Sequence, residues 1–169
     1  EMVNADMVWR DVPLWNLAQA IVMYPFTNFS INLLYQYPHN TMRVWKKLQK
    51  QYNKNYIIFA SVDAHAYIKI SDSWHLEFPA YETVFSMFQT TILSKEPFSG
   101  DFMHDSRLVY EALKNGKSYI GFGNLGNPKG FSFIAQKKEQ TYYPGDTVAR
   151  TGFGDDDTIT LRVNVPAQD

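Results

Sequence analysis

The sequence predicts an α/β protein in which an α/β part is followed by a small antiparallel β module. Apolar residues recur at helical spacing in several segments before about residue 125. A continuous apolar run at 56–62 is typical of a strand in a parallel sheet. After residue 127 the pattern changes to short alternating segments separated by turn sequences. We therefore expect an α/β part over residues 1–126 and a β-strand module over residues 127–169.

Four elements are expected before residue 56: the end of a strand at residues 1–4, and helices over 13–23, 29–37 and about 40–52. Asn40 or Thr41 is expected to cap the third helix, because both residue types accept hydrogen bonds from the first turn. The apolar residues of that helix lie at helical spacing and are expected to be buried: Val44, Trp45, Leu48 and Tyr52.

The middle of the chain predicts a strand, two helices and a second strand. The run 56–62 does not alternate, so we expect a central parallel strand buried on both faces. A helix is expected over 81–92, because one helical face contains Tyr81, Val84, Phe85, Phe88 and Ile92. A helix over 101–115 should end before Gly116, since glycine is favoured just after a helix, and a strand is expected over 118–122.

The C-terminal region predicts an antiparallel sheet. Its strands are expected at 131–135 and 159–165, where apolar and polar residues alternate. Between them lie two turn sequences, Pro144-Gly145-Asp146 and Gly152-Phe153-Gly154-Asp155.

Charge and composition exclude several classes of partner. Sixteen basic and seventeen acidic residues nearly cancel, so we expect neither nucleic acid nor an anionic membrane surface as a partner. No segment approaches the roughly 18 apolar residues that span a bilayer. The chain has no cysteine, so any metal site must use His, Asp or Glu. Nothing in the composition determines a cellular compartment.

The motif Ser61-Val62-Asp63-Ala64-His65-Ala66 directly follows the predicted parallel strand. Catalytic groups in α/β proteins gather beyond the carboxyl ends of parallel strands. In an extended backbone, Asp63 and His65 point the same way and can converge on one cation. A carboxylate and an imidazole suit zinc, manganese or iron. The alternative is that Asp63 caps a turn and His65 merely lies near it, and spacing alone leaves both interpretations open.

The same motif resembles the last metal-binding motif of the PHP family of phosphoesterases. Further segments are similar to the C-terminal part of that family: Phe78-Pro79-Ala80-Tyr81-Glu82-Thr83-Val84-Phe85, 105–113, Gly116-Lys117-Ser118-Tyr119-Ile120 and Gly130-Phe131-Ser132-Phe133. Glu1-Met2-Val3-Asn4 with Trp9-Arg10 resembles a late barrel strand and the segment that leaves it. The resemblance covers most of residues 1–135.

The resemblance implies the C-terminal part of a distorted (β/α)7 barrel whose strand ends hold two or three divalent ions. It implies hydrolysis of a phosphorylated small-molecule substrate by a metal-activated water. Only Asp63 and His65 match the family's ligand set. The remaining ligands are expected before Glu1, so the chain is expected to be a fragment that is not active alone.

Two further expectations remain open. The chain is alternatively a non-catalytic binding or structural module with a vestigial metal site and a β tail that binds a partner or carbohydrate. Self-association of the chain is also expected, because an incomplete barrel has open strand edges and an exposed apolar face.

Overall fold

The computed structural model describes residues 1–4, 12–65, 68–69, 71–123, 125–148 and 158–166. These residues form a mixed α/β structure with small parallel and antiparallel sheets, which confirms the α/β prediction. The described residues form no closed barrel. None of the described helices is long and apolar enough to cross a bilayer.

The chain divides into two compact units, each assembled from separate segments. Unit 1 contains residues 1–55, 59–90 and 120–127. Unit 2 contains residues 56–58, 91–119 and 128–169, so the C-terminal strands share a unit with earlier parts of the chain. The division at residues 126 and 127 stays a prediction.

The parallel pairing expected near residue 60 is present in unit 1. Strand β1 (Val3–Asn4) pairs in parallel with β2 (Ala60–Ser61), and Asn4 lies opposite Ser61. The prediction of a strand buried on both faces over 56–62 is wrong, because only two residues are strand and Ile57 and Phe59 are exposed. Among the described residues β2 pairs with β1 alone, so nothing forms a wider sheet around it.

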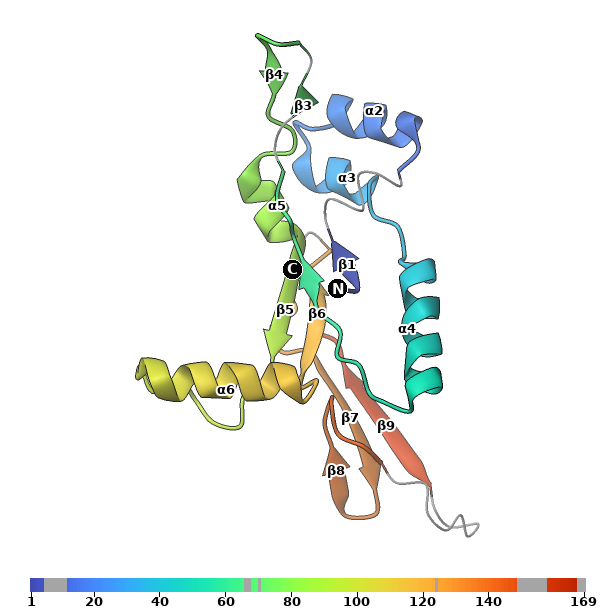
Figure 1. Ribbon diagram of the computed structural model, residues 1–169, viewed down its shortest axis with the longest axis vertical. Coiled ribbons are helices and arrows are strands. Elements are labelled where there is room, and N and C mark those ends of the chain that lie inside the picture. The colour runs from blue at the N-terminus through green and yellow to red at the C-terminus, as the bar shows by residue number, and fades with distance from the viewer. Residues whose placement is uncertain (5–11, 66–67, 70, 124, 149–157, 167–169) are drawn as a thin grey trace. The chain divides into compact units, whose positions relative to one another are not determined.

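Helices α2 (Leu14–Val22) and α3 (Thr27–Asn32) contact each other in unit 1 (Figure 1). Ser30 is fully buried and its hydroxyl donates a hydrogen bond of 2.6 Å to the carbonyl oxygen of Ala20. The expected helix over 13–23 is confirmed. The expected helix over 29–37 is shifted, since α3 begins earlier and ends at Asn32.

Helix α4 (His39–Tyr52) occupies the predicted position, but its predicted surroundings are wrong. No side chain caps its first turn, so neither Asn40 nor Thr41 has the expected role. The face that was expected to be buried is largely exposed, including Val44, Leu48 and Tyr52. Periodicity therefore identified the helix without identifying what covers it.

The predicted helix over 81–92 is correct only to its middle. Helix α5 (Tyr81–Met87) is followed at once by strand β5 (Phe88–Ile92), which pairs with β6 (Ser118–Phe122). The hydroxyl of Thr90 also bonds both the amide and the carbonyl of Ala60. These long-range partners and the β-branched residues at 90–92 favour the extended state over the helix.

The remaining elements before the C-terminal sheet are two short strands, a long helix and strand β6. Strands β3 (Ile68–Lys69) and β4 (His75–Leu76) form an antiparallel pair. Helix α6 (Phe102–Lys114) and strand β6 confirm the predictions at 101–115 and 118–122. Gly116 has φ +67° just after α6, which is the left-handed conformation expected of a glycine there.

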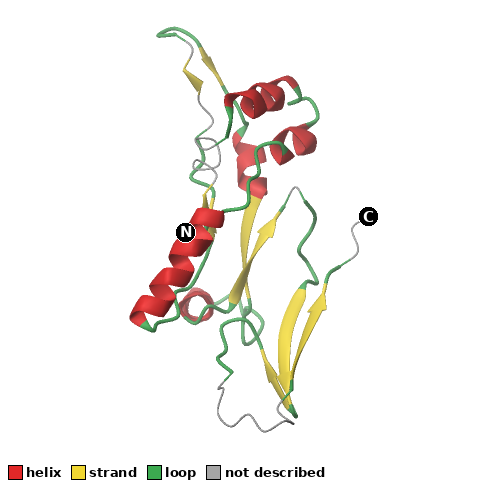
Figure 2. Cartoon of the chain, turned by 90° about the vertical axis from the view of Figure 1, so that its right-hand side faces the viewer, coloured by secondary structure: helices red, strands yellow, loops and turns green. Residues whose placement is uncertain are grey.

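The C-terminal residues form a three-stranded antiparallel sheet in unit 2 (Figure 2), in the order β8, β7, β9, as labelled in Figure 1. Strands β7 (Ser132–Lys137) and β9 (Ile159–Asn164) confirm the two predicted segments, while β8 (Gln140–Tyr142) is an additional strand. Residues 143–146 turn as predicted, with the Asp146 amide donating to the carbonyl of Tyr143. The predicted turn at 152–155, and Trp9 and Arg10, lie outside the described residues.

Candidate metal centre

The two predicted ligands lie just beyond the carboxyl end of the β1–β2 pair. Strand β2 ends at Ser61, and Asp63 and His65 follow within four residues. The expected extended backbone is not present at Asp63, which has φ +39° in the left-handed region. Aspartate is one of the few residue types with a side chain that enter this region readily. The chain therefore turns at the first predicted ligand.

This turn brings the two side chains close together. The Asp63 Oδ1 and His65 Nδ1 atoms are 3.8 Å apart. Both side chains are exposed, with accessible fractions of 51% for Asp63 and 64% for His65. This distance shows that the two side chains are neighbours, but it does not involve Nε2, the ring nitrogen that would bind a metal. The exposure of both side chains allows a solvated cation to reach them.

A backbone hydrogen bond orients the imidazole. His65 Nδ1 lies 2.7 Å from the carbonyl oxygen of Asp63, and a carbonyl oxygen only accepts. Nδ1 therefore carries the proton in this contact, and the lone pair of the neutral ring is at Nε2. Metal-binding histidines are commonly held in this way, with one ring N–H on a backbone carbonyl and the other nitrogen as the ligand.

The two side chains are of the types that bind divalent metals, but two protein ligands are too few for a complete site. One carboxylate and one imidazole suit zinc, manganese or iron, and the absence of cysteine excludes thiolate sites. A protein metal site ordinarily has at least three protein ligands. Across residues 1–4, 12–65 and the later described segments, no group of three or more His, Asp or Glu residues is placed to hold an ion. Asp63 and His65 are therefore at most part of a coordination sphere.

A second carboxylate lies on the β1–β2 pair and was not singled out by the sequence. Glu1 Oε2 accepts a hydrogen bond of 3.0 Å from the side-chain amide of Asn4. This bond, followed by one from Ser61, lowers the pKa of Glu1. The parallel pairing of Asn4 with Ser61 brings Ser61 within reach of Glu1. The bond from Ser61 joins residues sixty positions apart, so it has no local sequence signal.

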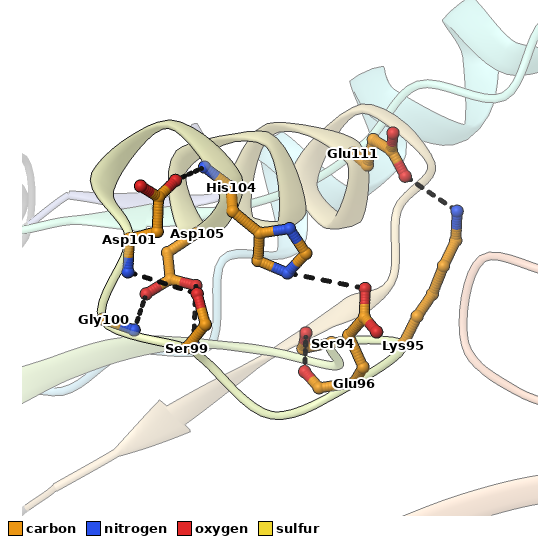
Figure 3. A network of polar contacts seen from close by, with 9 residues as sticks. All are labelled: Ser94, Lys95, Glu96, Ser99, Gly100, Asp101, His104, Asp105 and Glu111. Carbon is orange, nitrogen blue, oxygen red and sulfur yellow. Dashed lines mark hydrogen bonds and ion pairs between the residues drawn. The ribbon is translucent and has the colours of Figure 1, made fainter.

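Another cluster of polar side chains surrounds the start of α6 (Figure 3). Asp101 accepts a hydrogen bond of 2.8 Å from the amide of His104, as an N-cap residue does. Asp105 Oδ1 accepts from the amide of Ser99, and its Oδ2 accepts from the amide of Gly100. The bond from Ser99 is the main reason that the pKa of Asp105 is lowered.

Two further side-chain contacts in this cluster involve Glu111 and Glu96. Lys95 Nζ lies 2.7 Å from Glu111 Oε2, and His104 Nε2 lies 3.5 Å from Glu96 Oε1. The acidic side chains thus contact backbone amides, a lysine or a histidine of the protein itself. The cluster is a helix cap and a set of surface ion pairs.

Two other histidines have structural surroundings. The ring of His39 packs against Tyr37 with centroids 4.5 Å apart, and His75 lies in β4 opposite Lys69. Neither lies in a cluster of three or more potential ligands within the described residues.

Comparison with known proteins adds no relative. No protein-family model, no curated protein and no solved structure matches this chain.

Proposed function

We propose that this chain contributes Asp63 and His65 as ligands of a divalent metal centre in a phosphoesterase of the PHP type. The observation that carries the proposal is the position of these two exposed side chains beyond the carboxyl end of a parallel strand pair. Asp63 Oδ1 lies 3.8 Å from His65 Nδ1. The orientation of His65 by the Asp63 carbonyl is a second support, because it leaves the lone pair of the neutral ring on Nε2.

The proposed chemistry is hydrolysis of a phosphate ester on a small molecule. When bound, zinc, manganese or iron would lower the pKa of a coordinated water so that hydroxide forms near neutral pH. Within this proposal Asp63 supplies negative charge and His65 a neutral nitrogen to the ion. The proposal requires at least one further protein ligand from residues other than those described, because two ligands do not complete a site.

The proposed family membership rests on sequence motifs in addition to this geometry. The segment 61–66 resembles the family's last ligand motif, and the mixed α/β fold with a parallel β1–β2 pair is compatible with part of a distorted barrel. On this proposal the described residues are a portion of that barrel, with the remaining ligands supplied elsewhere in the protein.

The proposal is tested by metal analysis and hydrolysis of p-nitrophenyl phosphate on the longest form of the protein that can be expressed. The test variant is Asp63→Asn with His65→Ala, and the matched control is Asp72→Asn with His39→Ala, which removes the same residue types elsewhere in unit 1. We expect the test variant alone to lose bound metal and activity. Equal metal content and activity in test variant and control would overturn the proposal.

A second candidate is a binding module without catalysis, and one observation favours it. The apolar face of the C-terminal sheet is open to solvent, including Phe133, Leu161 and Val163. Exposed apolar surface of this kind commonly marks a site of association. Retention of partner binding by a variant that has lost both Asp63 and His65, together with no detectable metal in the unaltered protein, would favour this second function.

A further inference from the structure

Strand β9 forms one edge of the C-terminal sheet. It pairs with β7 along six consecutive residue pairs, from Ser132 opposite Asn164 to Lys137 opposite Ile159, without a bulge (Figures 1 and 2). In the part of the chain that the structure describes, no strand pairs with its other side. The backbone N–H and C=O groups on that side are therefore available to another strand.

The side chains of β9 do little to prevent such pairing. Natural edge strands are usually protected by charges, prolines, bulges or short length. Strand β9 has a single charge, Arg162, and its first proline comes at Pro166, beyond its end. Ile159, Leu161 and Val163 alternate with polar residues and have accessible fractions of 38%, 60% and 56%. This strand is a regular, exposed and apolar edge.

We propose that β9 pairs antiparallel with β9 of a second copy of this chain, so that two three-stranded sheets become one sheet of six strands. The pattern of the strand is complementary to itself when the twofold axis passes through Leu161. Leu161 then lies opposite its own copy, and Ile159 lies opposite Val163 of the second copy. Apolar cross-strand pairs of this kind stabilise antiparallel sheets.

Charge disfavours the neighbouring register centred on Arg162. An axis through Leu161 places the guanidinium of Arg162 opposite the uncharged Thr160 of the second copy. An axis through Arg162 would place two guanidinium groups opposite each other, and directly opposed like charges destabilise a strand pair. An axis through Val163 would bring Pro166 opposite Thr160, and proline has no N–H to donate.

The absence of cysteine makes this register directly testable by crosslinking. Leu161→Cys would place two sulfurs at the axis, where opposed Cα atoms in an antiparallel pair are about 4.5–5.5 Å apart and within disulfide range. Thr141→Cys on β8, the opposite edge of the same sheet, is the matched control. We expect mild oxidation of the 169-residue chain to give a covalent dimer with Leu161→Cys, at least several-fold faster than with Thr141→Cys.

A mixture of two single variants tests the register further. Ile159→Cys and Val163→Cys should crosslink to each other when mixed, and more slowly to themselves, because each faces the other across the axis. Light scattering on the unaltered chain should give twice its mass of 19.6 kDa, and Leu161→Lys, which opposes two ammonium groups at the axis, should give a single chain mass. A single chain mass for the unaltered protein, a dimer that persists in Leu161→Lys, or equal crosslinking at Leu161 and Thr141 would each overturn the proposal.

Discussion

The imidazole Nδ1 of His65 lies 2.7 Å from the carbonyl oxygen of Asp63, only two residues earlier in the chain. The contact is possible because Asp63 has a left-handed backbone conformation, with φ +39°, which turns its carbonyl toward the ring. The backbone of Asp63 thus makes a shorter contact with this nitrogen than the Asp63 carboxylate does, whose Oδ1 lies 3.8 Å away. This distinction separates the effects of substitutions at the two residues.

The tautomer of His65 should be independent of the Asp63 carboxylate. In the neutral ring we expect Nδ1 to carry the proton, because only a donor can bond the Asp63 carbonyl. Long-range ¹H–¹⁵N spectra distinguish the two ring nitrogens. The same pattern should appear in Asp63→Asn, since the carbonyl remains. A ring protonated mainly at Nε2, as in a freely exposed histidine, would contradict this account.

The contact between Ser30 and Ala20 should contribute measurably to the stability of unit 1. Ser30 is fully buried and its hydroxyl donates to the Ala20 carbonyl at 2.6 Å, joining α3 to α2. Ser30→Ala should lower the free energy of unfolding by about 1–2 kcal/mol, because a buried carbonyl loses its donor. Urea denaturation provides the measurement. Ser106→Ala, which removes a similar bond on the exposed side of α6, should change it by less than about 0.5 kcal/mol.

Gly145 should be intolerant of a side chain for a steric reason that Gly100 does not share. Both have nearly the same backbone conformation, with φ +89° and +87°. A methyl group at Gly145 would overlap the carbonyl oxygen of Asn115 and approach the Gly116 carbonyl carbon to 2.8 Å, whereas at Gly100 nothing lies within 4 Å.

Gly100→Ala should therefore lower the free energy of unfolding by only about 1 kcal/mol, the cost of the left-handed conformation. Gly145→Ala should lower it by about 2–4 kcal/mol, because overpacking is added to the same backbone cost. Thermal and urea unfolding of the two variants provide the comparison. Equal losses in both would show that the turn at 143–146 does not pack against the end of α6.

Asp146 should make stability depend on pH. Its Oδ2 accepts from the amide of Tyr143 at 2.8 Å and its Oδ1 lies 3.0 Å from Lys117 Nζ. The bond from Tyr143, followed by that from Lys117, lowers the pKa of Asp146. A lowered folded-state pKa contributes stability above the unfolded value of about 3.9, and that contribution is lost as pH falls through the folded value.

The measurement is the difference in unfolding free energy between the unaltered chain and Asp146→Asn. We expect the unaltered chain to be more stable by about 0.5–1 kcal/mol at pH 7, because the ion pair is partly exposed. The difference should shrink as pH falls through the folded-state pKa, because the aspartate then becomes protonated. A stability difference that does not change with pH would show that the charge of Asp146 does not contribute to stability.

The parts of the fold that depend on local pattern could be predicted, and the parts that depend on distant partners could not. Helix α6 has a capping aspartate, an apolar period and a following glycine, so its bounds are local properties. Residues 88–92 continue the apolar period of α5, yet form β5 because β6 and Thr90 provide distant partners. The exposed face of α4 shows the same limit, since periodicity cannot identify what covers a helix.

The candidate site divides in the same way. Asp63 and His65 are two residues apart, so their proximity could be predicted, although the left-handed turn that produces it could not. The bond from Ser61 to Glu1 instead depends on the pairing of β1 with β2, which joins residues nearly sixty positions apart. Any further ligand of the proposed centre would likewise depend on chain topology.

The central claim is that Asp63 and His65 bind one divalent ion together, and a zinc titration of the longest form of the protein that can be expressed tests it most directly. Calorimetry and the His65 ring ¹⁵N signals should report the same binding event, with the shift at Nε2. Because both ligands act on one ion, Asp63→Asn and His65→Gln should each weaken binding by at least tenfold, and the double variant should be little worse than either. Zinc binding with unchanged affinity in the double variant would contradict the claim.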